Sequence, residues 1–140
     1  QGRMGLRLME EGILSIISTN ELKFKPEVNV VSAQSAMIEH ESTEAYVVSD
    51  TDKYLGKIHL RSLILANPKA TVLDLIDPDA LSIKSDASIQ QAIESASNFI
   101  GETIPIIERE TNIFIGTVNE GDIFKMYLEL QGQTIDLEKR

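Results

Sequence analysis

The segment from Glu102 to Phe124, ETIPIIERETNIFIGTVNEGDIF, decides the fold. Its apolar run Ile104 to Ile107 is dominated by β-branched residues and predicts a buried central strand. The polar residues Arg109 to Asn112 predict a hairpin turn, and Phe114 to Val118 predicts the return strand. A helix is expected to begin near Gly121. The segment therefore predicts a strand, a hairpin, a second strand and a helix, in that order.

The same order of apolar and polar positions occurs earlier in the chain, which indicates an internal duplication. A shift of 59 residues places Ile13 to Ser18 on Val72 to Asp77. After one extra residue in the second hairpin loop, Leu55 to Ile58 falls on Ile115 to Val118. Few residues are identical between the copies, so the repeat is recognised from the order of apolar and polar positions rather than from sequence identity.

Each copy begins with a strand and a helix. Alternating apolar residues predict the strands at Leu22 to Phe24 and at Leu81 to Ile83. Apolar residues at three- and four-residue spacing predict a helix from Asn29 to His40, and a matching helix after Asp86. Together with the hairpin and the second helix, each copy is expected to have the order β-α-β-β-α. The predicted fold class is therefore mixed α/β, of the α+β type.

The expected domain boundaries follow this duplication. A copy of roughly 60 residues hides only about 60% of its unfolded surface, so the two copies are expected to pack together. The chain opens with Gln1, and we interpret it as a piece of a longer protein. The predicted parts are a lead-in helix and linker at 1–12, with its helix over Arg3 to Glu11, a first repeat at 13–67, a second repeat at 68–131, and a polar tail at 132–140.

The composition excludes several classes of protein. The 13 Lys and Arg residues face 22 Asp and Glu residues, and the net charge of -9 repels nucleic-acid phosphates. Apolar runs of at most about six residues are too short to cross a bilayer. There are no cysteines, which excludes disulfides and thiolate metal sites and favours a reducing compartment.

The sequence predicts no enzyme. It contains no phosphate-binding loop of the G-x-x-x-x-G-K-[ST] type, no H-E-x-x-H and no G-x-S-x-G, and it has only 2 His. The carboxylate pairs Asp50 with Asp52 and Asp77 with Asp79 contain ligands suited to a hard cation. Solvated turns explain these pairs better, so we predict neither a catalytic site nor a metal site.

The repeat, with a Gly-containing return strand that leads into the helix N-E-G-D-I-F, resembles a pair of CBS domains, the Bateman module. Residues 70–83, ATVLDLIDPDALSI, look like the family's linker and first strand. The lead-in G-R-x-G and the closing D-I-F-K-M-Y-L-E-L also resemble the cytoplasmic C-terminal module of ClC chloride channels and transporters. The resemblance implies pseudo-twofold packing of the repeats, a transmembrane transport domain in the parent chain, and a position on the cytoplasmic side of the cell membrane.

The resemblance also implies two nucleotide-sized clefts for ATP, ADP or AMP, with no ligand required for folding. In the family, an Asp accepts the ribose hydroxyls three residues after a Thr or Ser that follows the Gly strand. Asn119 and Asp122 occupy these positions in the second copy, and His59 and Ser62 occupy them in the first. The predicted residues of the usable cleft are Asp122, Asn119, Thr43, Ser42, Lys23 and Tyr46, and those of the degraded cleft are His59, Ser62, Thr103 and Pro105.

Several alternatives remain open at this stage. Asp122 is expected either to contact a ligand or to cap the last helix, and the two roles can coexist. His59 is interpreted as a structural residue, with a pH sensor or a ligand contact as the alternative. Glu44 would repel a triphosphate, and Lys23 and Arg61 are the nearby cations.

The predicted function is that of a regulatory module, which binds an adenine nucleotide or dimerises to modulate transport. A homodimer is expected through the repeat helices, with Ile93 to Phe99 and Ile123 to Leu130 as its surface. The alternatives are a ligand-free dimerisation scaffold and a divalent-cation sensor of another transporter.

Overall fold

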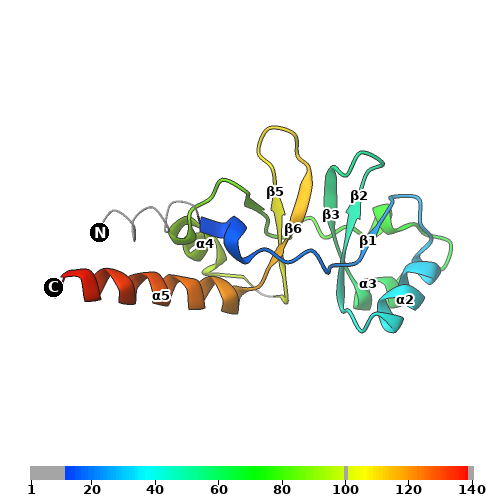
Figure 1. Ribbon diagram of the computed structural model, residues 1–140. Helices are drawn as coiled ribbons and strands as arrows, with labels where there is room; N and C mark the ends of the chain where they lie inside the picture. Colours follow the sequence, from blue (N-terminus) through cyan, green and yellow to red (C-terminus); the bar gives the residue numbers. More distant parts are fainter. Residues whose placement is uncertain (1–11, 100, 139–140) are drawn as a thin grey trace. The chain divides into compact units, whose positions relative to one another are not determined.

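The computed structural model describes residues 12–99 and 101–138, and the chain divides into two compact units (Figure 1). The first-sheet unit contains residues 20–80 and 110–114. The second-sheet unit contains, in the described part of the chain, residues 12–19, 81–109 and 115–138. The predicted lead-in helix from Arg3 to Glu11 lies outside the described residues.

The first-sheet unit is built on a three-stranded sheet of order β1-β2-β3. Strand β1 is parallel to β2, and β2 is antiparallel to β3. The two helices pack against each other, and the core includes Met37, Val47, Ile58 and Leu63, which are fully or almost fully buried. The elements are β1 (Lys23–Phe24), α2 (Val30–Glu39), β2 (Glu44–Val48), β3 (Tyr54–His59), α3 (Leu60–Leu65) and the 3-10 helix η2 (Val72–Leu75).

The second-sheet unit repeats this plan with a sheet of order β4-β5-β6. Its helices pack against each other and against a 3-10 helix, and its core includes Ile13, Ile89, Ile104 and Ile123. The elements are the 3-10 helix η1 (Gly12–Ile16), β4 (Ile83–Lys84), α4 (Ile89–Ala96), β5 (Ile104–Ile107), β6 (Phe114–Val118) and α5 (Glu120–Glu138).

Matched details confirm the β-α-β-β-α repeat. Phe24 lies opposite Val47 in one sheet, and the residues 59 positions later, Ile83 and Ile106, lie opposite each other in the second sheet. The first helix of each copy is capped by the matching residue as well. The Asn29 side chain accepts from the amide of Val31, and the Ser88 side chain accepts from the amide of Gln91.

Each unit takes its sheet from one copy and its lead-in segment from the other. The amide of Ser18 donates to the carbonyl of Thr117 at 2.7 Å, and the amide of Asp77 donates to the carbonyl of Lys57 at 2.8 Å. These two bonds join matching positions of the repeat. The boundaries between the compact units therefore include residues 19/20 and 80/81. The repeats predicted from the sequence begin instead at residues 13 and 68.

A glycine permits each of these close approaches. A side chain at Gly116 would meet the carbonyl oxygen of Ser18 at 2.5 Å, with Ile17 also in contact. A side chain at Gly56 would meet the side chain of Ile76. Because Ile17 and Ile76 also occupy matching positions, the two units use the same packing device.

The tip of the second hairpin completes the first-sheet unit. The amide of Tyr54 donates to the carbonyl of Asn112 at 2.9 Å, and the amide of Phe114 donates to the carbonyl of Asp52 at 2.9 Å. The ring of Phe114 lies 5.1 Å from that of Tyr46 and 6.0 Å from that of Tyr54, measured between centroids. Such ring pairs add to the stability gained from burial.

The last helix is longer than expected. Helix α5 begins at Glu120, close to the predicted start, and continues to Glu138 through most of the predicted polar tail. Within residues 12–99 and 101–138, no helix combines the length and the apolar character needed to span a membrane.

Candidate ligand-binding site

The residues predicted to bind a nucleotide are divided between the two units. The first-sheet unit contains Lys23, Ser42, Thr43, Tyr46, His59 and Ser62. The second-sheet unit contains Thr103, Pro105, Asn119 and Asp122.

A surface hollow of about 480 Å³ lies in the first-sheet unit, at the end of the β2–β3 hairpin. Glu44 lies opposite His59 in the antiparallel register, and the amide of Leu60 donates to the carbonyl of Thr43 at 2.9 Å. This register brings Thr43 beside His59, although the two were predicted for different clefts. The residues that line this β2–β3 hollow are Thr43, Glu44, His59, Leu60, Arg61, Ile64 and Leu65.

The charge of Glu44 is balanced within the protein. Its Oε1 lies 2.8 Å from Nζ of Lys57, and only 7% of the Glu44 side chain and 3% of the Lys57 side chain are exposed. Lys57 Nζ also lies 5.9 Å from the centre of the Tyr46 ring. The predicted repulsion between Glu44 and a phosphate is therefore offset by a neighbouring cation. Sequence reasoning missed Lys57, and the available signal was a lysine inside the apolar run of β3.

His59 joins this ion pair to the segment between the two copies. Its Nε2 donates to Oδ2 of Asp77 at 2.8 Å, and its Nδ1 lies 3.9 Å from Oε2 of Glu44. The amide of Asp79, which donates to Oδ1 at 2.9 Å, and the His59 side chain both lower the pKa of Asp77 below its ordinary value of 3.8. Burial and the Asp77 charge raise the pKa of Tyr54 to about 12, so Tyr54 is neutral.

In the second-sheet unit, Asn119 caps helix α5. The amide of Asp122 donates to Oδ1 of Asn119 at 2.7 Å, and Nδ2 of Asn119 donates to Oδ2 of Asp122 at 3.0 Å. Asp122 is an acidic residue of the first turn, where a negative charge is favourable, and the ligand role of both residues stays a prediction. Asp122 also lines a hollow of about 310 Å³ with Ile16, Lys125, Met126 and Glu129.

Two predicted site residues are closed to solvent. The side chain of Tyr46 is 1% exposed and packs against Phe114, and Pro105 is buried in β5. Both side chains contribute to the protein core, and the prediction that these two residues contact a ligand stays a prediction.

The other predicted residues lie nearer the surface. Lys23 is exposed, and its Nζ lies 5.8 Å from the centre of the Phe114 ring. Ser42 Oγ lies 3.0 Å from Nδ1 of His40, and Ser62 and Thr103 are half-buried at the starts of α3 and β5. The assignment of Lys23 and Ser42 to the usable cleft, and of Ser62 and Thr103 to the degraded cleft, stays a prediction.

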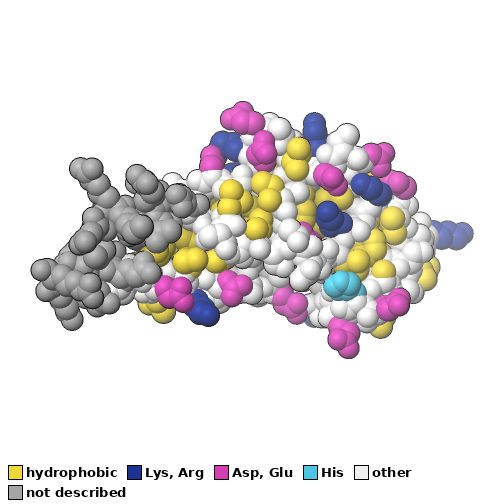
Figure 2. Space-filling view, in the orientation of Figure 1, with side chains coloured by type: hydrophobic (Ala, Val, Ile, Leu, Met, Phe, Trp, Pro, Cys, Tyr) yellow, Lys and Arg dark blue, Asp and Glu magenta, His cyan; other side chains and the backbone are white. Residues whose placement is uncertain are grey.

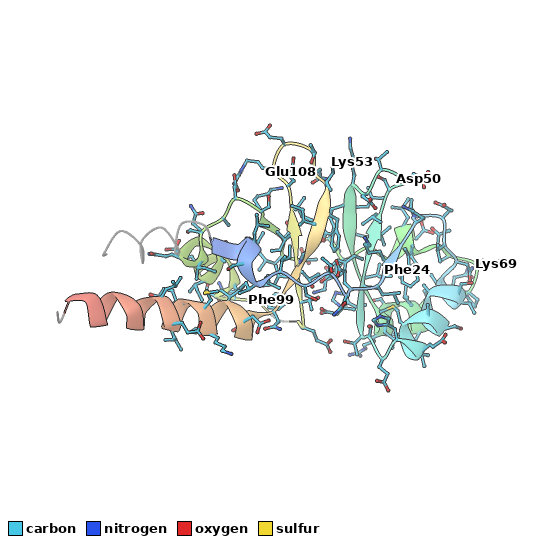
Figure 3. All side chains as sticks on the ribbon, viewed as in Figure 1. Phe24, Asp50, Lys53, Lys69, Phe99 and Glu108 are labelled. Atoms are coloured by element: carbon cyan, nitrogen blue, oxygen red, sulfur yellow. The ribbon has the colours of Figure 1, made fainter. Side chains whose placement is uncertain are left out.

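The pair Asp50 and Asp52 is exposed, in agreement with the solvated-turn interpretation, whereas Asp77 of the second pair is half-buried against His59. Asp50 and Lys53 lie at the tip of the hairpin between β2 and β3 (Figure 3), and Asp52 is exposed beside them. In the part of the chain that the structure describes, no cluster of three or more His, Asp or Glu residues is suited to hold a metal ion.

Part of the chain matches a known family. Residues 72–129 match the family model of the CBS domain. The architecture, two copies of β-α-β-β-α in a mixed α+β fold, is shared with a solved CBS pair domain.

The most informative relatives come from magnesium transport proteins. The chain is 24% identical over 94 residues, 67% of its length, to the magnesium transporter MgtE of Thermus thermophilus. It spans only 20% of that relative's length.

Solved structures share the fold. The CBS pair domain of a putative Mg²⁺ transporter from Shewanella oneidensis has a TM-score of 0.77 at 19% identity, covering 91% of this chain and 78% of that one. The cytosolic domain of the Mg²⁺ channel MgtE, solved in complex with ATP, has a TM-score of 0.73 at 16% identity. That match covers 88% of this chain and 51% of the other.

Proposed function

We propose that the chain is the regulatory CBS pair of a larger magnesium transport protein, that it binds an adenine nucleotide, and that it lies on the cytoplasmic side of the membrane. The observation that carries the proposal is the shared fold, over 88% of the chain, with the cytosolic domain of a Mg²⁺ channel solved with ATP. A transmembrane transport domain in the same parent chain is the proposed partner. We propose no catalytic activity for the pair.

A magnesium transporter replaces the chloride channel suggested by the G-R-x-G lead-in. Both the curated relative and the two solved structures described above are magnesium transport proteins. The lead-in itself lies outside the described residues. These comparisons give no support to the chloride-channel assignment, whereas the alternative of another transporter agrees with them.

Asp122 is the residue we propose to hold the ribose. Its carboxylate is exposed at the first turn of α5, and two vicinal hydroxyls can donate to one ionised carboxylate. Arg61 is the proposed phosphate contact in the β2–β3 hollow, where Lys57 offsets the charge of Glu44. Asp122 belongs to the second-sheet unit and Arg61 to the first-sheet unit, and a separate variant tests each of them.

Nucleotide binding is expected to raise the thermal stability of the chain. A ligand at a hundred times its dissociation constant adds about 2.7 kcal/mol to the free energy of unfolding. We expect a rise in melting temperature with ATP, ADP or AMP in a thermal-shift series, and we expect Asp122→Ala to abolish it. Because Asp122 also contributes to the cap of α5, each variant's melting temperature is compared with and without nucleotide.

Two controls identify the site. Arg61→Gln tests the β2–β3 hollow without disturbing α5. Glu129→Gln changes another acidic residue of the hollow that Asp122 lines, and this variant is expected to retain the rise in melting temperature with nucleotide. If wild-type protein shows no shift with any of the three nucleotides, the nucleotide proposal is wrong and the scaffold alternative replaces it.

Magnesium itself is the second candidate ligand. The similarity of this chain to a magnesium transporter favours magnesium as a ligand. The net charge of -9 also produces a repulsion that a divalent cation would relieve. Magnesium chloride without nucleotide therefore forms a separate arm of the same series. A shift that depends on magnesium alone and survives in Asp122→Ala would assign the response to the cation.

We also propose that the pair forms a homodimer through its helices. Of the face expected over Ile123 to Leu130, Ile123 and Leu130 are buried in the core, whereas Phe124 and Leu128 are exposed. Apolar side chains are exposed among acidic ones on the face shown in Figure 2. The exposed apolar residues on helices are Val31, Ile38, Ile64, Leu65, Phe124 and Leu128.

The most exposed of these residues provides the test. Leu65 is 76% exposed on α3, so Leu65→Lys is expected to preserve the fold and to weaken a dimer that buries this face. Sedimentation equilibrium of wild type and variant measures the change, with Lys69→Glu as a charge control outside the helix. A wild-type chain that stays monomeric at high micromolar concentration would contradict the dimer.

A further inference from the structure

Four charged side chains form a chain of contacts in the first-sheet unit. Glu44 on β2 pairs with Lys57 on β3 at 2.8 Å, and His59 on β3 lies 3.9 Å from Glu44. His59 then pairs at 2.8 Å with Asp77, in the segment that joins the two copies. We call these residues the charged quartet. The quartet therefore connects the wall of the β2–β3 hollow to the joining segment.

The second-sheet unit has no charged side chain at any of the four matching positions. The backbone hydrogen bond is nevertheless present in both units. The amide of Asp77 donates to the carbonyl of Lys57 at 2.8 Å, and the amide of Ser18 donates to the carbonyl of Thr117 at 2.7 Å. The charges are therefore not needed to attach a lead-in segment to its sheet. The residues that match Glu44, Lys57, His59 and Asp77 are Thr103, Thr117, Asn119 and Ser18.

The charge of the quartet depends on the imidazole. When His59 is neutral, the quartet contains two carboxylates and one ammonium group and is negatively charged. When His59 is protonated, the quartet's two positive charges balance the two negative ones. Glu44 and Lys57 are almost completely buried, where an unbalanced charge is costly. Arg61 on α3 lines the same hollow from the solvent side, and Tyr54 on β3, close to Asp77, stays neutral.

We propose that His59 is a proton-dependent clamp, which in its protonated form holds the joining segment Ile76 to Ala80 tightly against the first-sheet unit. The ion pair requires an ionised Asp77, and the hydrogen bonds from Asp79 and His59 lower the pKa of Asp77 below its ordinary value of 3.8. It also requires an imidazolium, because only the protonated ring carries a charge opposite to that of Asp77. The clamp is therefore tighter at mildly acidic pH than at higher pH. It acts without a nucleotide and does not depend on the proposed function.

Amide hydrogen exchange measured by NMR tests this clamp in the whole chain. The amide of Asp77 reports on the first-sheet unit, and the amide of Ser18 provides the matching internal control. After correction for intrinsic exchange rates, we expect the Asp77 amide to be protected about two- to fivefold more at about pH 5.5 than at about pH 7.5. The protection factor of the Ser18 amide is expected to change with pH only as far as the global unfolding equilibrium of the chain changes.

Variants that copy the uncharged positions separate the clamp from general stability. His59→Asn and Asp77→Ser are each expected to remove the extra pH dependence of residue 77, and both keep its backbone amide. His40→Asn changes the second histidine, which is exposed and contacts Ser42, and is expected to leave the dependence intact. Extra pH dependence that persists in both His59→Asn and Asp77→Ser, or that is absent from wild type, would overturn the proposal.

Discussion

Lys57→Met is expected to lower the free energy of unfolding by about 3 to 5 kcal/mol, because it removes one partner of a buried ion pair. Glu44, with 7% of its side chain exposed, would keep its charge in the interior without the ammonium group 2.8 Å away. Urea denaturation at neutral pH, followed by circular dichroism, measures the loss.

The double variant Glu44→Met with Lys57→Met is the control for this prediction. It removes both charges and retains apolar volume, so it is expected to recover most of the stability lost in Lys57→Met. Equal stability of Lys57→Met and wild type would show that the pair is solvated, in contradiction to the burial described above.

Gly116→Ala is expected to destabilise the protein by about 1 to 3 kcal/mol, the range for overpacking a filled core. The added carbon would lie 2.5 Å from the carbonyl oxygen of Ser18 and 2.8 Å from Cγ1 of Ile17. Because the nearest atom belongs to the backbone, the neighbouring segment must shift and weaken its bond to Thr117. Urea denaturation measures this loss as well.

Two other glycines serve as matched controls. Gly132 in α5 has no atom near the position of an added carbon, so Gly132→Ala is expected to stabilise the chain by about 0.4 to 1 kcal/mol. At Gly56 the obstacle is the β-branched side chain of Ile76, so Gly56→Ala is also expected to destabilise the chain. A Gly116→Ala variant as stable as Gly132→Ala would be inconsistent with the close approach.

Local patterns predicted the secondary structure because each pattern has a local physical cause. Asn29 and Ser88 are good capping residues at matching positions, and both begin helices as expected. The apolar run Ile104 to Ile107 forms a buried strand. The internal repeat supported each prediction, because two copies with few identical residues both had to be compatible with the order β-α-β-β-α.

The site was harder to predict because it depends on register and on distant pairing. The sequence does not reveal that Glu44 lies opposite His59, and so it did not bring Thr43 and His59 together. A lysine in a strand is usually exposed, whereas Lys57 is buried by its pairing with Glu44. Tyr46 was expected to contact a ligand, but its ring is covered by Phe114, which is distant in the sequence.

The two copies exchange their lead-in segments, and the β2–β3 hollow and the charged quartet lie in a unit built in this way. Methyl NOE measurements on the isoleucines test this exchange directly. We expect NOEs from the Ile17 methyl groups to Gly116 and from the Ile76 methyl groups to Gly56. NOEs from Ile17 to Gly56 and from Ile76 to Gly116 would show instead that each copy keeps its own lead-in segment.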